Sequence, residues 1–145
     1  MTAKEYLSKI QGYKQTMQKY SDRIEELYAD ASGLKAIVYD KDHVQASPED
    51  RTEKIFIKIE AEAEKYARAR VRYERELHKR IDMISALDNP QHIKLLTLRY
   101  VDGQRWEEIA CAMHYSFRHV TRLHGQALAA FTAYHKDVLL CPKGP

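Results

Sequence analysis

The sequence has few of the residues that interrupt helices, since only 5 glycines and 4 prolines occur in 145 residues. Folds with frequent tight turns, such as β-sandwiches and barrels, need more of these residues, so the scarcity argues against them. Charged residues make up 31% of the chain, and high charge with few helix breakers favours long helices. The sequence therefore predicts an all-α protein.

Long apolar runs and paired cysteines are also missing. No segment approaches the roughly 18–20 apolar residues of a membrane span, and the N-terminus lacks the pattern of a signal peptide. We therefore expect a cytoplasmic protein with no membrane partner. Cys111 and Cys141 form no C-x-x-C pair, which argues against a disulfide framework and a zinc finger. Cys111 is expected to be a small buried side chain.

The motifs of common enzyme classes do not occur in the sequence. There is no glycine-rich phosphate loop, no H-E-x-x-H and no nucleophile elbow. His114, His119 and His124 are spaced five apart, which does not place consecutive ones on one helical face. We therefore expect a protein that is not an enzyme and has neither a cofactor nor a metal site.

The N-terminal part has an apolar side chain at every third or fourth position, a heptad pattern typical of a helix that packs along another helix. Its positions are Ala3, Tyr6, Ile10, Tyr13, Met17, Tyr20, Ile24, Leu27, Ala31, Leu34 and Val38. Residues 39–52 break the pattern, and Ser47-Pro48 is a strong turn signal. A second pattern follows at Phe56, Ile59, Ala63, Tyr66, Arg70, Tyr73, Leu77, Arg80, Ile84 and Leu87.

Two long helices joined by a short segment form a long antiparallel helical hairpin (coiled coil) within one chain, or exchange partners in a dimer. Both arrangements stay open. We expect residues 1–87 to serve oligomerisation, as a homodimer through the long helices, or partner binding. Basic residues line the outer face of the second helix, either as a solvated face or as a stripe for DNA phosphates or an acidic protein. They are Lys65, Arg68, Arg72, Arg75 and Lys79.

Residues 88–134 are expected to form a three-helix domain. Asn89 caps a helix with Pro90 in its first turn. A short helix from Trp106, a turn at residues 114–116 and a longer helix Phe117–Phe131 have the pattern of a helix-turn-helix, in which the second helix reads DNA. His114 stands where most such turns have glycine, a position that often needs positive φ. Residues 135–145 are expected to be a flexible tail, in which residues 138–140 either pack back or bind a partner.

The helix-turn-helix segment resembles region 4 of sigma-70-type factors. The matching residues are Glu107, Glu108, Ile109, Ala110, Ser116, Val120, Leu123, Ala127 and Leu128. The wider stretch 95–131 is more similar to a family of small proteins from phages and prophages of Gram-positive bacteria, akin to the late regulators of the ArpU and RinA type. These proteins pair an N-terminal coiled coil with a domain like sigma region 4. The resemblance implies a transcriptional regulator in the bacterial host cytoplasm.

No carboxylate occurs between Ile109 and Lys136, although the net charge of the whole chain is only +3. The candidates for contact with double-stranded DNA are Arg105, Ser116, Phe117, Arg118, His119, Thr121, Arg122 and Gln126. The resemblance implies that Arg118, His119 and Arg122 read the major groove. Arg105 is a phosphate candidate, Thr121 and Gln126 suit a base edge or a phosphate, and Phe117 suits a thymine methyl or the core.

We therefore expect a sequence-specific regulator that reads promoter DNA, either as an activator or as a sigma-like factor in contact with RNA polymerase. Four histidines in the acid-free stretch suggest that DNA affinity rises as the pH falls toward 6. Two alternatives remain, a small-terminase-like subunit that recognises DNA for packaging and a protein-only helical adaptor.

Overall fold

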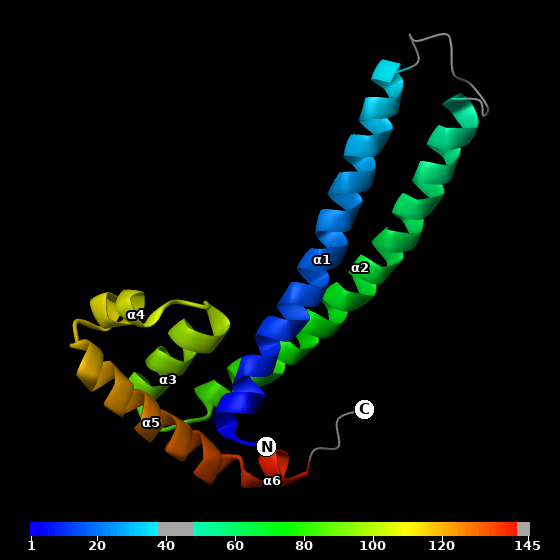
Figure 1. Cartoon of the computed structure of the whole chain (residues 1–145). Coiled ribbons are helices and arrows are strands. Elements are labelled where there is room, and N and C mark those ends of the chain that lie inside the picture. Colours follow the sequence, from blue (N-terminus) through cyan, green and yellow to red (C-terminus); the bar gives the residue numbers. More distant parts are fainter. Residues whose placement is uncertain (38–47, 142–145) are drawn as a thin grey trace. The chain divides into compact units, whose positions relative to one another are not determined.

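The computed structural model describes residues 1–37 and 48–141, and every regular element in these ranges is helical (Figure 1). The elements are α1 (Ala3–Ile37), α2 (Pro48–Ser85), α3 (Pro90–Leu96), the π-helical turn η1 (Thr97–Val101), α4 (Trp106–Met113), α5 (Phe117–Tyr134) and α6 (Lys136–Leu140). The predicted all-α class is confirmed. None of these described helices combines the length and apolarity needed to cross a membrane. The break predicted over residues 39–52 is wrong for residues 48–52, which form the first turns of α2 because Pro48 suits the first turn of a helix, and residues 39–47 lie outside the described residues.

The chain divides into two compact units. The first contains Met1–Gly12 and the chain from Tyr73 onward, and the second contains Tyr13–Arg72. Because α1 and α2 both cross from one unit into the other, each long helix contributes residues to both.

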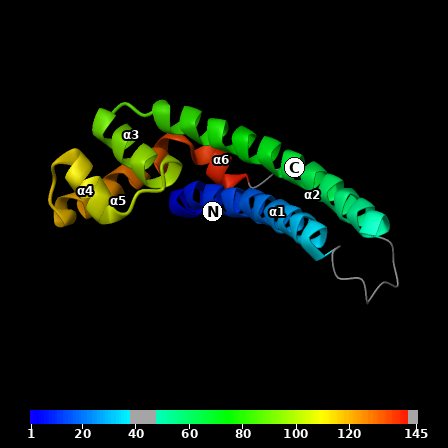
Figure 2. The same cartoon turned by 90° about the horizontal axis from the view of Figure 1, so that it is seen from above.

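In the second unit, α1 and α2 run side by side in opposite directions (Figures 1 and 2). The heptad pattern of α1 agrees with burial, because each of its positions from Ala3 to Ala31 is buried or half-buried. The side chain of Leu34 and all of Val38 lie outside the described part. The apolar positions of α1 therefore form its buried face, as predicted.

The heptad pattern predicted for α2 is wrong at three positions. Phe56, Ala63 and Arg70 are exposed, whereas Glu62 and Ala69, each one residue earlier, are half-buried. A single neighbouring helix covers a sector only about 100° wide. In α2 that sector is centred on the line through Ile59 and Tyr66 and leaves the flank with Phe56 in water.

The core of the first unit draws on each of the helices that the structure describes. Its buried side chains are Ala3, Tyr6, Leu7, Met83, Ile84, Leu87, Leu95, Leu96, Tyr100, Ile109, Met113, Val120, Leu123, Ala127, Phe131 and Leu139. Burying a large apolar side chain contributes about 1.5–3 kcal/mol. The first turns of α1 and the last turns of α2 therefore help to stabilise the unit that contains α3, α4 and α5.

The flexible tail predicted for residues 135–145 is wrong as far as Cys141, whereas the alternative in which residues 138–140 pack back is confirmed at Leu139. Residues 136–140 form α6, and Leu139 is buried in the core of the first unit. His135 donates a hydrogen bond from Nε2 to the Met83 carbonyl oxygen at 2.7 Å. This apolar burial and hydrogen bond outweigh the turn-forming composition on which the prediction rested, while residues 142–145 lie outside the described range.

Arg80 occupies a heptad position of α2 although its side chain is charged, and its contacts compensate for the burial of that charge. Its side chain is buried, and its Nε donates to the Tyr6 carbonyl oxygen at 3.0 Å. Its Nη1 donates to a carboxylate oxygen of Glu76 at 2.7 Å, and the guanidinium carbon lies 4.3 Å from the centre of the Tyr6 ring. Burial raises the pKa of Glu76, but the hydrogen bond and charge of Arg80 outweigh it, so this pKa lies below its ordinary value.

We expect Glu76→Gln to lower the free energy of unfolding by about 2 kcal/mol at pH 7, because Arg80 stays buried without its charged partner. A carboxyl with a depressed folded pKa stabilises the protein above its unfolded pKa, and this contribution is lost as the pH falls through the folded pKa. The difference between wild type and variant should therefore shrink below about pH 4. Urea unfolding at pH 7 and pH 3 measures this, and an equal difference at both values would contradict it.

Candidate nucleic-acid interface

Helices α4 and α5 are joined by a short connection in which His114 has a left-handed backbone. Its φ is 58° and its ψ is 39°, and it is the only non-glycine residue with positive φ among the residues described. This conformation allows the Tyr115 N–H to donate to the Ala110 carbonyl oxygen at 3.0 Å, which closes the end of α4. The positive φ expected at His114 is confirmed.

The start of α5 is fixed by a side-chain cap. The Ser116 hydroxyl oxygen accepts a hydrogen bond from the His119 N–H at 3.2 Å, and Ser116 itself has an extended backbone. This bond satisfies one of the backbone donors left unpaired at a helix start. Ser116 therefore fixes where α5 begins, and its exposed hydroxyl remains at the edge of the candidate surface.

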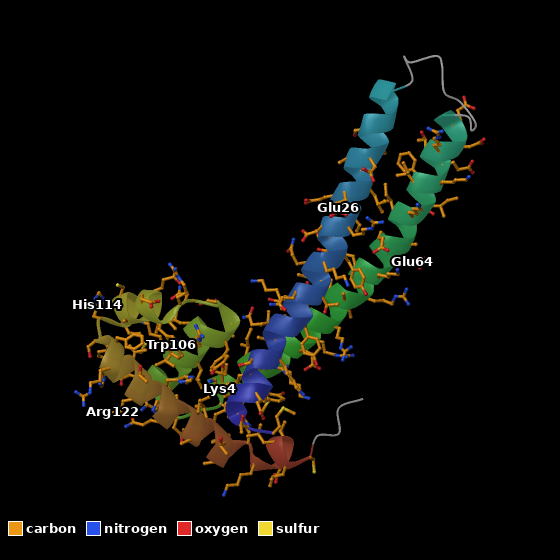
Figure 3. The ribbon with its side chains drawn as sticks, in the orientation of Figure 1. Lys4, Glu26, Glu64, Trp106, His114 and Arg122 are labelled. Atoms are coloured by element: carbon orange, nitrogen blue, oxygen red, sulfur yellow. The ribbon has the colours of Figure 1, made fainter. Side chains whose placement is uncertain are left out.

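Helix α5 has two contrasting faces. Its buried side chains are Val120, Leu123, Ala127 and Phe131. The candidates on the other face are all exposed, and they are Arg118, His119, Thr121, Arg122 and Gln126. Figure 3 shows Arg122 projecting outward from α5, away from Trp106. The helix thus presents two arginines, a histidine, a threonine and a glutamine to solvent, on a segment without a carboxylate.

Three candidates differ in how they are available for contact. Phe117 is 56% exposed, so its alternative place in the core is excluded. The Thr121 hydroxyl donates to the Phe117 carbonyl oxygen at 2.9 Å, which leaves it lone pairs for a donor but no proton for a phosphate. Arg105 is exposed, but its Nη2 lies 3.5 Å from a Glu108 carboxylate oxygen. A phosphate at Arg105 would therefore compete with Glu108.

His124 lies on the half-buried side of α5, behind the candidate face. Its Nε2 is 2.9 Å from the Tyr100 hydroxyl, and its ring is edge-on to Trp106 with ring centres 4.7 Å apart. Burial, followed by the charges of Lys4 and Arg99, lowers the pKa of His124 to about 4. His124 is therefore neutral near pH 6, and the prediction that four histidines raise DNA affinity at this pH is wrong in its inclusion of His124.

A layer of supporting contacts was not predicted from the sequence. The Arg99 guanidinium lies 4.4 Å from the centre of the Trp106 ring, and its Nη1 donates to the Gln104 carbonyl oxygen at 2.9 Å. On the other side, Gln91 donates to the Tyr115 hydroxyl at 2.7 Å, and the Tyr115 ring lies edge-on to His119. Residues of α3 and η1 thus help to position α4 and α5.

One further correction concerns Cys111, which is exposed rather than buried. Ile109 and Met113 form the buried face of α4. Cys111 lies between them in sequence, and helical geometry turns it toward solvent.

We expect His114→Val to lower the free energy of unfolding by about 1–2 kcal/mol, because a β-branched residue is strained at positive φ. His114→Gly should leave stability unchanged or raise it, since glycine adopts this conformation without strain. Ala129→Gly, in the regular part of α5, is the control and should cost about 1 kcal/mol. Urea unfolding followed by circular dichroism measures all three, and a valine variant as stable as wild type would contradict the expectation.

We also expect His124 to stay neutral down to about pH 5, as judged by its imidazole signals in an NMR titration. Its pKa in the folded chain is lower than in the unfolded chain, so the unfolded state takes up the proton first on acidification. The folded state should therefore lose stability as the pH falls from 6.5 toward 4, and His124→Phe should reduce this loss. If His124 instead titrated near pH 6.5, its imidazole would be exposed to water in the folded chain, and the expectation would be contradicted.

Comparison with known proteins adds no family assignment, because the chain matches no protein-family model, no curated protein and no solved structure. The chemistry of the exposed face of α5 therefore stands on the residues and contacts described above.

Proposed function

We propose that this protein is a sequence-specific DNA-binding transcriptional regulator of phage or prophage type, which reads promoter DNA with α5. The main support for the proposal is that α5 is held in place on one side and exposes basic side chains on the other. One side of α5 is held in a core, while Arg118 and Arg122 lie exposed one turn apart on the other side. An exposed helix with such side chains suits the major groove of B-DNA.

In this proposal α4, the connection at His114 and α5 act as a helix-turn-helix of the sigma region 4 type. A short helix, a three-residue connection and a longer capped helix are consistent with that motif. The resemblance of residues 95–131 to phage regulators agrees with the same assignment. The proposal includes contact with RNA polymerase. The sigma-like sequence pattern is the support for this contact.

Each exposed side chain receives a role from its chemistry. Arg118 and Arg122 suit bidentate contacts with guanine O6 and N7, and Gln126 suits adenine. The Thr121 hydroxyl donates its proton within α5, so its oxygen suits the role of acceptor for an amino group of a base. Arg105 suits a phosphate, which positions the protein without specifying the sequence.

The long helices are proposed to form a helical hairpin that joins two copies into a homodimer. A net charge of +3 provides little non-specific attraction. A second DNA-binding domain in the same particle raises the overall affinity without new contacts at either site. Dimerisation would thus compensate for the modest basic excess of a single chain.

The experiment is to select bound fragments from the genome that carries the gene and to measure their affinity across a salt series. We expect specific binding with a steep negative slope of log affinity against log salt. Arg118→Ala combined with Arg122→Ala should weaken specific binding by about 100-fold or more, because each base contact is worth about 1–3 kcal/mol.

The matched control is Lys14→Ala combined with Lys19→Ala, which removes two exposed positive charges from α1. It should change affinity far less than the arginine pair. Equal effects of the two double variants would assign the binding to overall charge. Unchanged specific binding in the arginine variant would overturn the assignment of the site to α5.

A further inference from the structure

Helix α2 carries an exposed heptad stripe on the flank that α1 does not cover. We call it the outer stripe, and its residues are Phe56, Glu60, Ala63, Ala67 and Arg70. They are spaced alternately four and three residues apart, so they lie along one side of the helix. Phe56 is 47% exposed, and the adjacent Val71 is 64% exposed. An apolar and charged heptad stripe in water is typical of a helix that packs against a further helix.

The outer stripe is complementary to itself when two copies run in opposite directions. Glu60 and Arg70 are equidistant from position 65, and so are Ala63 and Ala67. A two-fold axis passing at position 65 therefore sets Glu60 of each copy against Arg70 of the other and Ala63 against Ala67. A two-fold interface requires this reciprocal pairing, in which one residue contacts a second and the second contacts the first.

Charge and size both favour the antiparallel pairing. A parallel pair in register would set Glu60 against Glu60 and Arg70 against Arg70, and like charges that face each other are destabilising. The small side chains of Ala63 and Ala67 at the centre allow the two helix axes to approach closely. Phe56 lies at one end of the stripe, and the same two-fold axis sets it against Glu74 of the other copy, so pairing removes part of its exposed ring from water.

We infer that the outer stripe of α2 is the surface through which a second copy of this chain docks, with the two α2 helices antiparallel. This assigns a specific surface and orientation to the proposed homodimer. It is independent of DNA binding, since none of its residues belongs to α5.

The test uses the full chain and a charge exchange, followed by sedimentation equilibrium over a wide concentration range. Wild type should dimerise, and E60R and R70E should each weaken dimerisation by about tenfold or more, because each change makes two symmetry-related pairs repulsive. The double variant E60R/R70E should recover an affinity near that of wild type, because the exchanged charges again attract across the two-fold axis.

The matched control is K58E, which reverses one charge at an exposed position on the opposite side of α2. It should dimerise like wild type, and circular dichroism should show the same helix content in all variants. Monomeric wild type, rings of more than two chains, single variants that dimerise normally or a double variant without recovery would each overturn the inference. Specific DNA binding by a monomeric variant would leave the regulator proposal standing.

Discussion

The apolar face of α5 is the constraint on which the candidate site depends. Val120, Leu123, Ala127 and Phe131 recur at helical spacing and are buried together. Burial of these four side chains holds the helix in one rotational setting about its own axis. The same setting places Arg118 and Arg122 in solvent. The orientation of the proposed DNA-reading side chains is thus a consequence of hydrophobic packing on the opposite side of the helix.

Polar contacts refine what the packing sets. His124 occupies the boundary between the two faces of α5, where its neutral ring bonds to Tyr100 and packs against Trp106. A charged imidazole would be costly at this half-buried position, and its lowered pKa avoids that cost. Arg99 stacks on the other partner, Trp106. The side chains of His124, Tyr100, Trp106 and Arg99 that support α5 therefore keep the same charge between about pH 5 and pH 8.

Features that depend on neighbours in sequence were predicted well. The cap at Asn89 and the positive φ of His114 both follow from residues within a few positions of one another. The all-α class follows from the scarcity of helix breakers. The proposed roles of Arg118 and Arg122 in DNA recognition are predictions from side-chain chemistry.

Features that depend on distant partners were missed. The buried line of α2 is set by where α1 packs, which the heptad spacing of α2 alone does not specify. The neutral state of His124 depends on burial and on charges from α1 and η1, and the burial of Leu139 depends on a core assembled from all the helices. Arg80 can be buried at a heptad position because a carbonyl oxygen of α1 accepts a hydrogen bond from it.

The contacts of Tyr6 have a consequence for the order in which the protein folds. Its carbonyl oxygen and its hydroxyl bond to Arg80 and Met83, which follow it by 74 and 77 positions. Isolated helices form within about a microsecond, whereas contacts between distant positions must wait for the intervening chain to be closed into a loop. Pairing of α1 with α2 shortens that loop. During synthesis on a ribosome, the first turns of α1 therefore reach their place in the core only after the end of α2 has emerged.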